Sequence, residues 1–164
     1  MNKHTISVEV ENHSGVLSRI SGLFSARGFN ISSLSVAPTE DKSVSKMTIF
    51  VEGDDDKEIE QITKQLNKLV DVIKVVDFSE HERVERELIL ITLNAPAIKR
   101  TEIMSVVEIF KGSVLTVSEK EMTIELSGAA EKLANFIDLL RPYGIKELAR
   151  SGPIAVAKVK NIIE

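Results

Sequence analysis

The 164-residue sequence contains no cysteine and no tryptophan, and only 4% of its residues are aromatic. The absence of cysteine excludes disulfide bonds and thiolate metal ligands. Any core must therefore be aliphatic, and the hydrophobic content of 43% is enough to build one. Because the sequence has no apolar run of 18 or more residues, we expect no membrane-spanning helix. The first residues lead into a strand pattern rather than a signal peptide, so we expect a cytoplasmic protein.

The sequence also has no excess of positive charge, with 21 basic against 25 acidic residues. The net charge is -4, with 9 basic against 13 acidic residues over positions 1–80 and 12 against 12 over positions 81–164. A nucleic-acid surface needs a basic footprint to displace counterions. Neither half offers one, so we expect neither a nucleic-acid partner nor a membrane partner.

The first half of the chain predicts the order strand, helix, strand, strand, helix, strand. The predicted elements are a strand over residues 4–10, a helix over about 15–27, a strand over about 29–37, a strand around 47–51, a helix opening at 54–56, and a strand over 72–78. Ser14 is predicted to cap the first helix and Gly28 to end it. We expect a bulge at Ser32-Ser33, and we interpret the acidic run 54–56 as a solvated helix start rather than a metal site.

The second half repeats this order after a charged segment, residues 79–86, that either links the halves or extends into the next strand. The predicted elements are a strand over 88–93, a helix capped by Thr101 and ended by Gly112, a hairpin of 114–117 with 122–126, and a helix that stops at Pro142. A final segment from about Ile145, interrupted by Ser151-Gly152-Pro153, is predicted to offer Ile154 and Val156 to the last strand. The chain is thus predicted to hold two α+β domains of the ferredoxin-like β-α-β-β-α-β type, at residues 1–79 and 80–164. The strand over 88–93 is apolar on both faces, which favours sheet-on-sheet packing and a homodimer.

The sequence gives no sign of catalysis. The three histidines, His4, His13 and His81, lack the short spacing of a metal site, and no glycine-rich phosphate loop is present. We interpret His13 as a solvent-facing loop residue rather than a general base. We therefore predict no catalytic residue and no metal ligand.

The most informative segment is Asn12-His13-Ser14-Gly15-Val16-Leu17, between the first strand and the first helix. A glycine turn on a helix N-terminus suits a small anion such as an amino-acid carboxylate. We expect Asn12 and Asn30, at the ends of the first two strands, to be neighbours in space, because those strands are predicted to lie side by side and antiparallel. Their amides would then surround a zwitterion.

Three apolar side chains, Val16, Leu17 and Ile31, are predicted to line this pocket. The residues alone leave an alternative open: Asn12 and Gly15 form only a tight turn, and Asn30 only caps a strand.

The segment from Glu11 to Ile20 resembles the opening of an ACT domain, a small-molecule-sensing module with the β-α-β-β-α-β order. More specifically, the chain resembles the regulatory (small) subunits of acetolactate synthase, also called acetohydroxyacid synthase. The matching segments are residues 22–31, 33–40, 45–49, 65–72, 84–88 and 149–152. Ser14 stands where many ACT domains have proline, and His13 where this family often has an acidic or other polar residue.

The resemblance implies a homodimer whose N-terminal ACT domains pair and create two valine sites at their interface. It implies a chain without catalysis or cofactor of its own, which activates a catalytic (large) subunit carrying thiamine diphosphate, FAD and magnesium and confers feedback inhibition by branched-chain amino acids. The valine-site residues implied by the motif are Asn12, Gly15, Val16, Leu17, Asn30 and Ile31.

The second copy has Asn94-Ala95-Pro96-Ala97 at the equivalent turn, without the glycine, so we do not expect it to bind valine. The competing interpretation is a stand-alone ACT-type sensor that regulates another enzyme or a transcription system.

Overall fold

A computed structural model describes residues 2–53, 56–78 and 82–159. The chain divides into two compact units, one made of the residues up to Val84 with those from Ile154 onward, and the other of Glu85–Pro153. The predicted boundary lies between residues 79 and 80, whereas this division falls after Val84. The prediction also places the segment from Ile154 in the second domain, whereas here it belongs to the first unit. Each unit is described by itself below.

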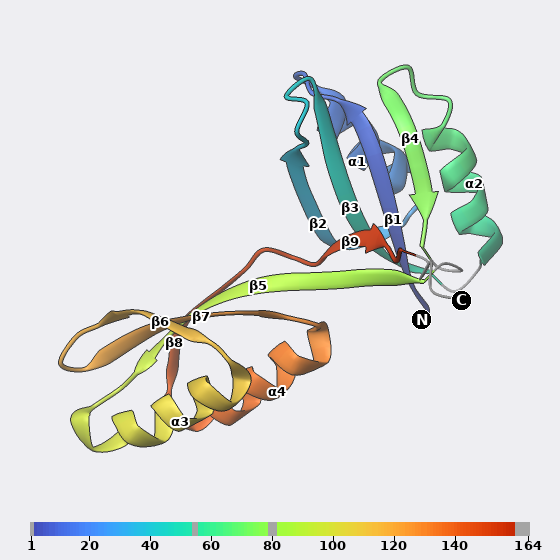
Figure 1. Cartoon of the computed structure of the whole chain (residues 1–164). Helices are drawn as coiled ribbons and strands as arrows, with labels where there is room; N and C mark the ends of the chain where they lie inside the picture. The colour runs from blue at the N-terminus through green and yellow to red at the C-terminus, as the bar shows by residue number, and fades with distance from the viewer. Residues whose placement is uncertain (1, 54–55, 79–81, 160–164) are drawn as a thin grey trace, which may run out of the picture. The chain divides into compact units, whose positions relative to one another are not determined.

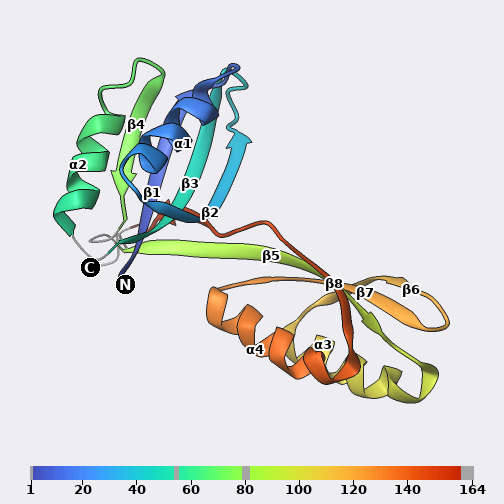
Figure 2. The same ribbon diagram turned by 180° about the vertical axis from the view of Figure 1, so that it is seen from behind.

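The first unit has the predicted element order. Its elements are β1 (Asn2–Glu11), α1 (Val16–Ala26), β2 (Asn30–Pro38), β3 (Val44–Gly53), α2 (Asp56–Leu66) and β4 (Val72–Asp77). The strands form an antiparallel sheet in the order β2-β3-β1-β4, and both helices lie on one face of it (Figures 1 and 2). This is the ferredoxin-like arrangement that the sequence predicts.

Alternating apolar residues on the central strands build the core of this unit. Ile6, Val8 and Val10 of β1 are fully buried, and Ile6 pairs with Ile49 of β3. The helices add side chains spaced three or four residues apart, which places them on one helix face. These buried helix residues are Val16, Ile20 and Phe24 of α1 and Ile59, Ile62 and Leu66 of α2.

Strand β2 lies at an edge of this sheet and pairs with β3. Its register shifts between Ile31 and Ser33, which confirms the predicted bulge. The Ser32 hydroxyl donates to the Phe50 carbonyl at 3.2 Å, so the extra residue keeps a bond to β3.

The second unit repeats the same path. Its main elements are β5 (Arg83–Asn94), α3 (Arg100–Phe110), β6 (Ser113–Val117), β7 (Glu121–Gly128), α4 (Ala130–Leu140) and β8 (Ile145–Arg150), with short 3-10 turns η1 (Ala97–Lys99) and η2 (Arg141–Tyr143). The strand order is β6-β7-β5-β8, with α3 and α4 on one face. On β5, Ile89 and Ile91 are buried whereas Leu88 and Leu90 are exposed, so the strand has two apolar faces as predicted.

The structure corrects the predicted last strand. The fourth strand of the second sheet is β8 alone, and a separate strand, β9 (Ile154–Ala157), pairs with β5 and belongs to the first unit. Gly152, at φ +73°, and Pro153 break the two strands apart. Residues 83–86 extend into β5, whereas residues 79–81 and the acidic pair 54–55 lie outside the described residues.

Both predicted serine and threonine caps are wrong. The residue at the N-cap of α1 is Gly15, one position after Ser14, and it has no side-chain cap hydrogen bond. Helix α3 is preceded by η1, which moves its start ahead of Thr101 and puts Lys99 at the N-cap. Gly28 does follow the end of α1 with φ +76°, as predicted. Among the described residues, we find no helix both long and apolar enough to cross a membrane.

Candidate functional site

The turn between β1 and α1 is built around Gly15. This glycine has φ +89°, in the left-handed region, and its carbonyl accepts the Arg19 N–H at 3.0 Å in the first turn of α1. A Cβ built on Gly15 would meet no atom within 4 Å, so the space beside the turn is open. The first N–H groups of a helix have no intrahelical acceptor and attract anions. The turn therefore offers backbone donors next to open space.

Asn12 ties this turn to the β2–β3 hairpin loop. Its backbone N–H donates to the Ser43 carbonyl at 2.7 Å, and its side-chain Nδ2 donates to the Lys42 carbonyl at 2.8 Å. Since the amide nitrogen points to the loop, the amide oxygen is the atom that would accept a hydrogen bond from a ligand ammonium group.

The prediction that Asn12 and Asn30 are neighbours within one chain is wrong. Glu11, next to Asn12, pairs with Val44 at one end of β3, whereas Asn30 pairs with Glu52 at the other end. Eight residues of strand separate these points, which corresponds to about 26 Å. Strands β1 and β2 are each antiparallel to β3, which lies between them, so they are parallel to one another. A strand–helix–strand connection produces this arrangement, because the crossing helix returns the chain to the same end of the sheet.

The other predicted residues divide in the same way. Val16 and Leu17 lie with Asn12 and Gly15 at the start of α1, but the Val16 side chain is only 2% exposed in the core, so this residue offers the turn its backbone N–H. Leu17 is 43% exposed beside the turn. Ile31 is half-buried near the Asn30 end of β2. One chain thus places four of the six predicted residues together and two at the opposite end of the sheet.

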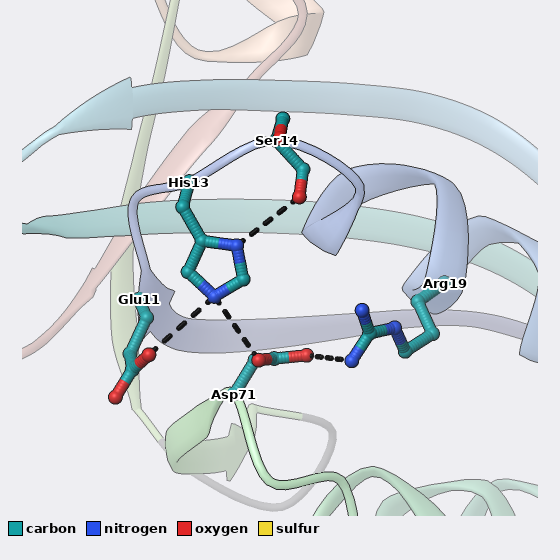
Figure 3. A network of polar contacts seen from close by, with 5 residues as sticks. All are labelled: Glu11, His13, Ser14, Arg19 and Asp71. Atoms are coloured by element: carbon teal, nitrogen blue, oxygen red, sulfur yellow. Dashed lines mark hydrogen bonds and ion pairs between the residues drawn. The ribbon is translucent and has the colours of Figure 1, made fainter.

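A buried carboxylate, Asp71, lies behind the turn, directly before β4 (Figure 3). Its backbone carbonyl accepts the Glu11 N–H at 2.9 Å. Its Oδ1 accepts from His13 Nε2 at 3.1 Å, and its Oδ2 accepts from the Arg19 guanidinium. The Glu11 carboxylate is also 3.4 Å from His13 Nε2. Four residues from β1, the turn, α1 and the position before β4 therefore form one ionic network.

Both ring nitrogens of His13 face hydrogen-bond acceptors. Its Nδ1 lies 3.1 Å from the Ser14 carbonyl oxygen, and its Nε2 lies 3.1 Å from Asp71 Oδ1. A carbonyl and a carboxylate only accept, so both contacts are hydrogen bonds when the ring is protonated. The bond to the Ser14 carbonyl has the largest effect and raises the pKa of His13 above its ordinary value. Desolvation, the next largest effect, opposes this rise, and the contacts with Asp71 and Glu11 raise the pKa further.

The sequence interpretation missed Asp71 and Arg19. They are 52 residues apart in the chain, so no local spacing reveals their contact. His13 is 47% exposed, close to the predicted loop residue, but it is held by the network. The ligand atoms of Glu11, His13 and Asp71 lie within 4.8 Å of one another, close enough for a metal ion. Arg19 already pairs with Asp71, and His13 lies between Asp71 and Glu11, so we assign the cluster to ion pairing.

The equivalent turn of the second unit makes the same backbone bonds with different side chains. The Asn94 and Ala95 N–H groups donate to the Gly144 and Lys120 carbonyls, as those of Glu11 and Asn12 do to Asp71 and Ser43. Ala95 therefore occupies the position of Asn12, and Gly144 that of Asp71. In this second turn, the Arg100 side chain donates to the Ala95 carbonyl at 3.0 Å. The second turn thus lacks the amide, the left-handed glycine and the buried carboxylate of the first.

Comparison with known proteins agrees with this architecture in both units. Residues 6–74 match the family model described as "AHAS small subunit-like ACT domain", and residues 86–159 match "Small subunit of acetolactate synthase". The chain is 53% identical over 156 residues to the probable acetolactate synthase small subunit of Archaeoglobus fulgidus, covering 95% of this chain and 97% of that protein. It is 50% identical over 155 residues to the acetolactate synthase small subunit of Mycolicibacterium smegmatis, covering 94% and 91%.

A solved structure extends the likeness to the whole fold. The crystal structure of the acetolactate synthase small subunit from Thermotoga maritima matches with a TM-score of 0.89 at 41% identity, covering 98% of this chain and 100% of that chain. The fold and the turn therefore define a regulatory module of the ACT class, joined to a second unit of the same topology. The chain belongs to the family of acetolactate synthase small subunits.

Proposed function

We propose that this chain activates the catalytic subunit of a thiamine-diphosphate-dependent acetolactate synthase and makes that enzyme sensitive to inhibition by valine. The family assignment over both units supports a regulatory subunit with a catalytic partner. The thiamine diphosphate, FAD and magnesium expected for this chemistry belong to the partner subunit. This chain's own role is to bind the effector and to change the activity of the catalytic subunit in response.

The open turn at Gly15 carries the proposal. Backbone N–H groups at the start of α1 would bind the effector carboxylate, and the Asn12 amide oxygen would accept from its ammonium group. The exposed Leu17 offers an apolar contact for a branched side chain. Asp71 adds no direct contact in this scheme.

Two copies of the chain are needed to bring in Asn30 and Ile31. Strand β2 is an edge strand, so its outer backbone groups are available to a second copy. If the β2 strands of two copies pair antiparallel about a two-fold axis, the Asn30 end of one meets the Pro38 end of the other. Pro38 pairs with Ser45, which neighbours the Asn12 turn along β3. The Asn30 end of one copy then lies at the same end of the combined sheet as the Gly15 turn of its partner.

This arrangement suggests how the effector would regulate. A ligand shared by two copies stabilises the relative orientation that it bridges, and it shifts a population only by its differential affinity for the two states. A coupling free energy of about 1–3 kcal/mol is enough for clear inhibition. In this scheme the effector-bound orientation activates the catalytic subunit less well.

The test is calorimetric titration of L-valine into the purified chain and two matched variants. Gly15→Asp places a carboxylate against that of the ligand and strains the turn, and we expect it to abolish binding and inhibition while stimulation of the catalytic subunit remains. Ala97→Asp puts the same charge at the equivalent turn of the second unit, where Ala97 is exposed, and should bind valine like the wild type. Wild-type binding by Gly15→Asp would refute the proposed site.

A further inference from the structure

Asp71 is a buried charge that the proposed effector site does not use directly. Its side chain is only 7% exposed, yet both carboxylate oxygens are hydrogen-bonded, to His13 and to Arg19. A buried carboxylate is costly unless it is paired in this way. Because Asp71 lies directly behind the turn between β1 and α1, it is placed to influence ligand binding at Gly15 as well as stability.

The two side chains that Asp71 contacts lie on opposite sides of Gly15 in the sequence. His13 precedes the glycine in the turn, and Arg19 follows it on α1, where the Arg19 N–H also bonds the Gly15 carbonyl at 3.0 Å. The backbone of Asp71 holds the end of β1 through the Glu11 N–H. One residue therefore fixes the strand end, the turn and the first turn of the helix relative to one another.

The second unit offers an internal comparison. Gly144 occupies the position of Asp71 and accepts the equivalent backbone bond, from Asn94 at 3.0 Å, but it has no side chain. The fold of this unit thus forms without the carboxylate. The carboxylate is present in the unit whose turn has the left-handed glycine and the open space.

We propose that Asp71 is a positioning residue for the effector site, whose carboxylate holds the turn through His13 and Arg19 in the conformation that binds the ligand carboxylate. This inference rests on the proposed function. It has a pH-dependent consequence, because neutral His13 has a single N–H and cannot donate to both the Ser14 carbonyl and Asp71. The charged groups that face His13 are Glu11 from β1 and Asp71 before β4, with Arg19 of α1 on the far oxygen of Asp71. Effector affinity should therefore fall as the pH rises through the pKa of His13.

Asp71→Asn separates positioning from simple electrostatics. Removing a negative charge near a carboxylate-binding turn would by charge alone tighten the binding of valine, whereas loss of positioning must weaken it. We expect at least a tenfold loss of affinity at pH 6.5, measured by calorimetry on the full chain. Asp138→Asn is the matched control, because Asp138 of α4 forms an exposed ion pair with Arg141, and its valine affinity should equal that of the wild type.

His13→Gln provides a second variant at a half-exposed position, where folding should be undisturbed. Wild-type affinity should be higher at pH 6.5 than at pH 8.5, and this difference should disappear in His13→Gln. The pKa of the His13 ring, followed by NMR, should drop in Asp71→Asn, because the Asp71 carboxylate helps to raise it.

The outcomes distinguish the two proposals. Folded Asp71→Asn protein that binds valine as tightly as the wild type would overturn the positioning role and leave the proposed function intact. A wild-type pH dependence retained in His13→Gln would also overturn it. Wild-type protein that binds no branched-chain amino acid would overturn the proposed function, and the positioning role with it.

Discussion

Three glycines of the first unit differ in backbone conformation but share open surroundings, so alanine substitution can measure how strongly the Gly15 turn requires glycine. Gly15 and Gly28 flank α1 with φ +89° and +76°, whereas Gly22 lies inside the helix. A Cβ built on any of the three meets no atom within 4 Å. Substitution by alanine therefore tests conformation without a steric clash.

The expected free-energy changes have opposite signs. Gly15→Ala and Gly28→Ala should each destabilise the first unit by about 1–2 kcal/mol, since an L-residue in the left-handed region costs that amount. Gly22→Ala should stabilise it by up to about 1 kcal/mol, because alanine is the better helix former by that amount. Gly15→Ala should also weaken valine binding, whereas Gly22→Ala should not.

The assay must report each unit separately. The sequence has no tryptophan, and its single tyrosine, Tyr143, lies in the second unit, so intrinsic fluorescence does not follow the first. Urea unfolding monitored by the methyl signals of Ile6 and Ile91, which are buried in the first and second cores, resolves the two. If Gly15→Ala were as stabilising as Gly22→Ala, the left-handed turn and the site built on it would be refuted.

Three further predictions concern packing and charge. Phe24→Ala removes a fully buried ring of α1 and should cost the first unit about 3–5 kcal/mol in urea unfolding; a loss below about 1 kcal/mol would contradict the assigned core. Arg150→Gln should destabilise the second unit by about 1–3 kcal/mol, because it leaves the buried Glu87 carboxylate without its two-bond partner. Glu60→Gln, in an exposed pair with Lys64, should leave stability unchanged. The pKa of His13 is raised on folding, so its contribution to stability is complete below the ordinary pKa of 6.5 and is lost as the pH rises through the pKa of the folded state. The difference in stability between the wild type and His13→Gln should therefore shrink over that pH range. A difference that does not change with pH would argue against the ion pair.

Patterns of period two and period three to four were enough to predict both units and most of their cores. Apolar residues that alternate lie on one face of a strand, as Ile6, Val8 and Val10 do. Apolar residues spaced three or four apart lie on one face of a helix, as Ile59, Ile62 and Leu66 do. Each of these residues is buried. Even the bulge in β2 could be predicted, because the apolar spacing skips a residue there.

The site was harder to predict because its geometry depends on topology. Asn12 and Asn30 flank elements joined by one helix, which suggests proximity, but the insertion of β3 between β1 and β2 and their parallel direction separate them. Asp71 gave no local signal, since its partners lie more than 50 residues away. The cap of α1 was misplaced by one residue because glycine, rather than serine, provides the turn.

The central claim is an effector site completed by two chains, and a purified heterodimer tests it most directly. One chain carries Gly15→Asp and the other Asn30→Ala, with different affinity tags to isolate the mixed dimer. If each site combines the turn of one chain with the Asn30 end of the other, the heterodimer keeps one intact site, while neither homodimer keeps any. The account predicts that the heterodimer binds about half as much valine per chain as the wild type, with wild-type affinity. A heterodimer that binds no valine, or an Asn30→Ala homodimer that binds like the wild type, would contradict it.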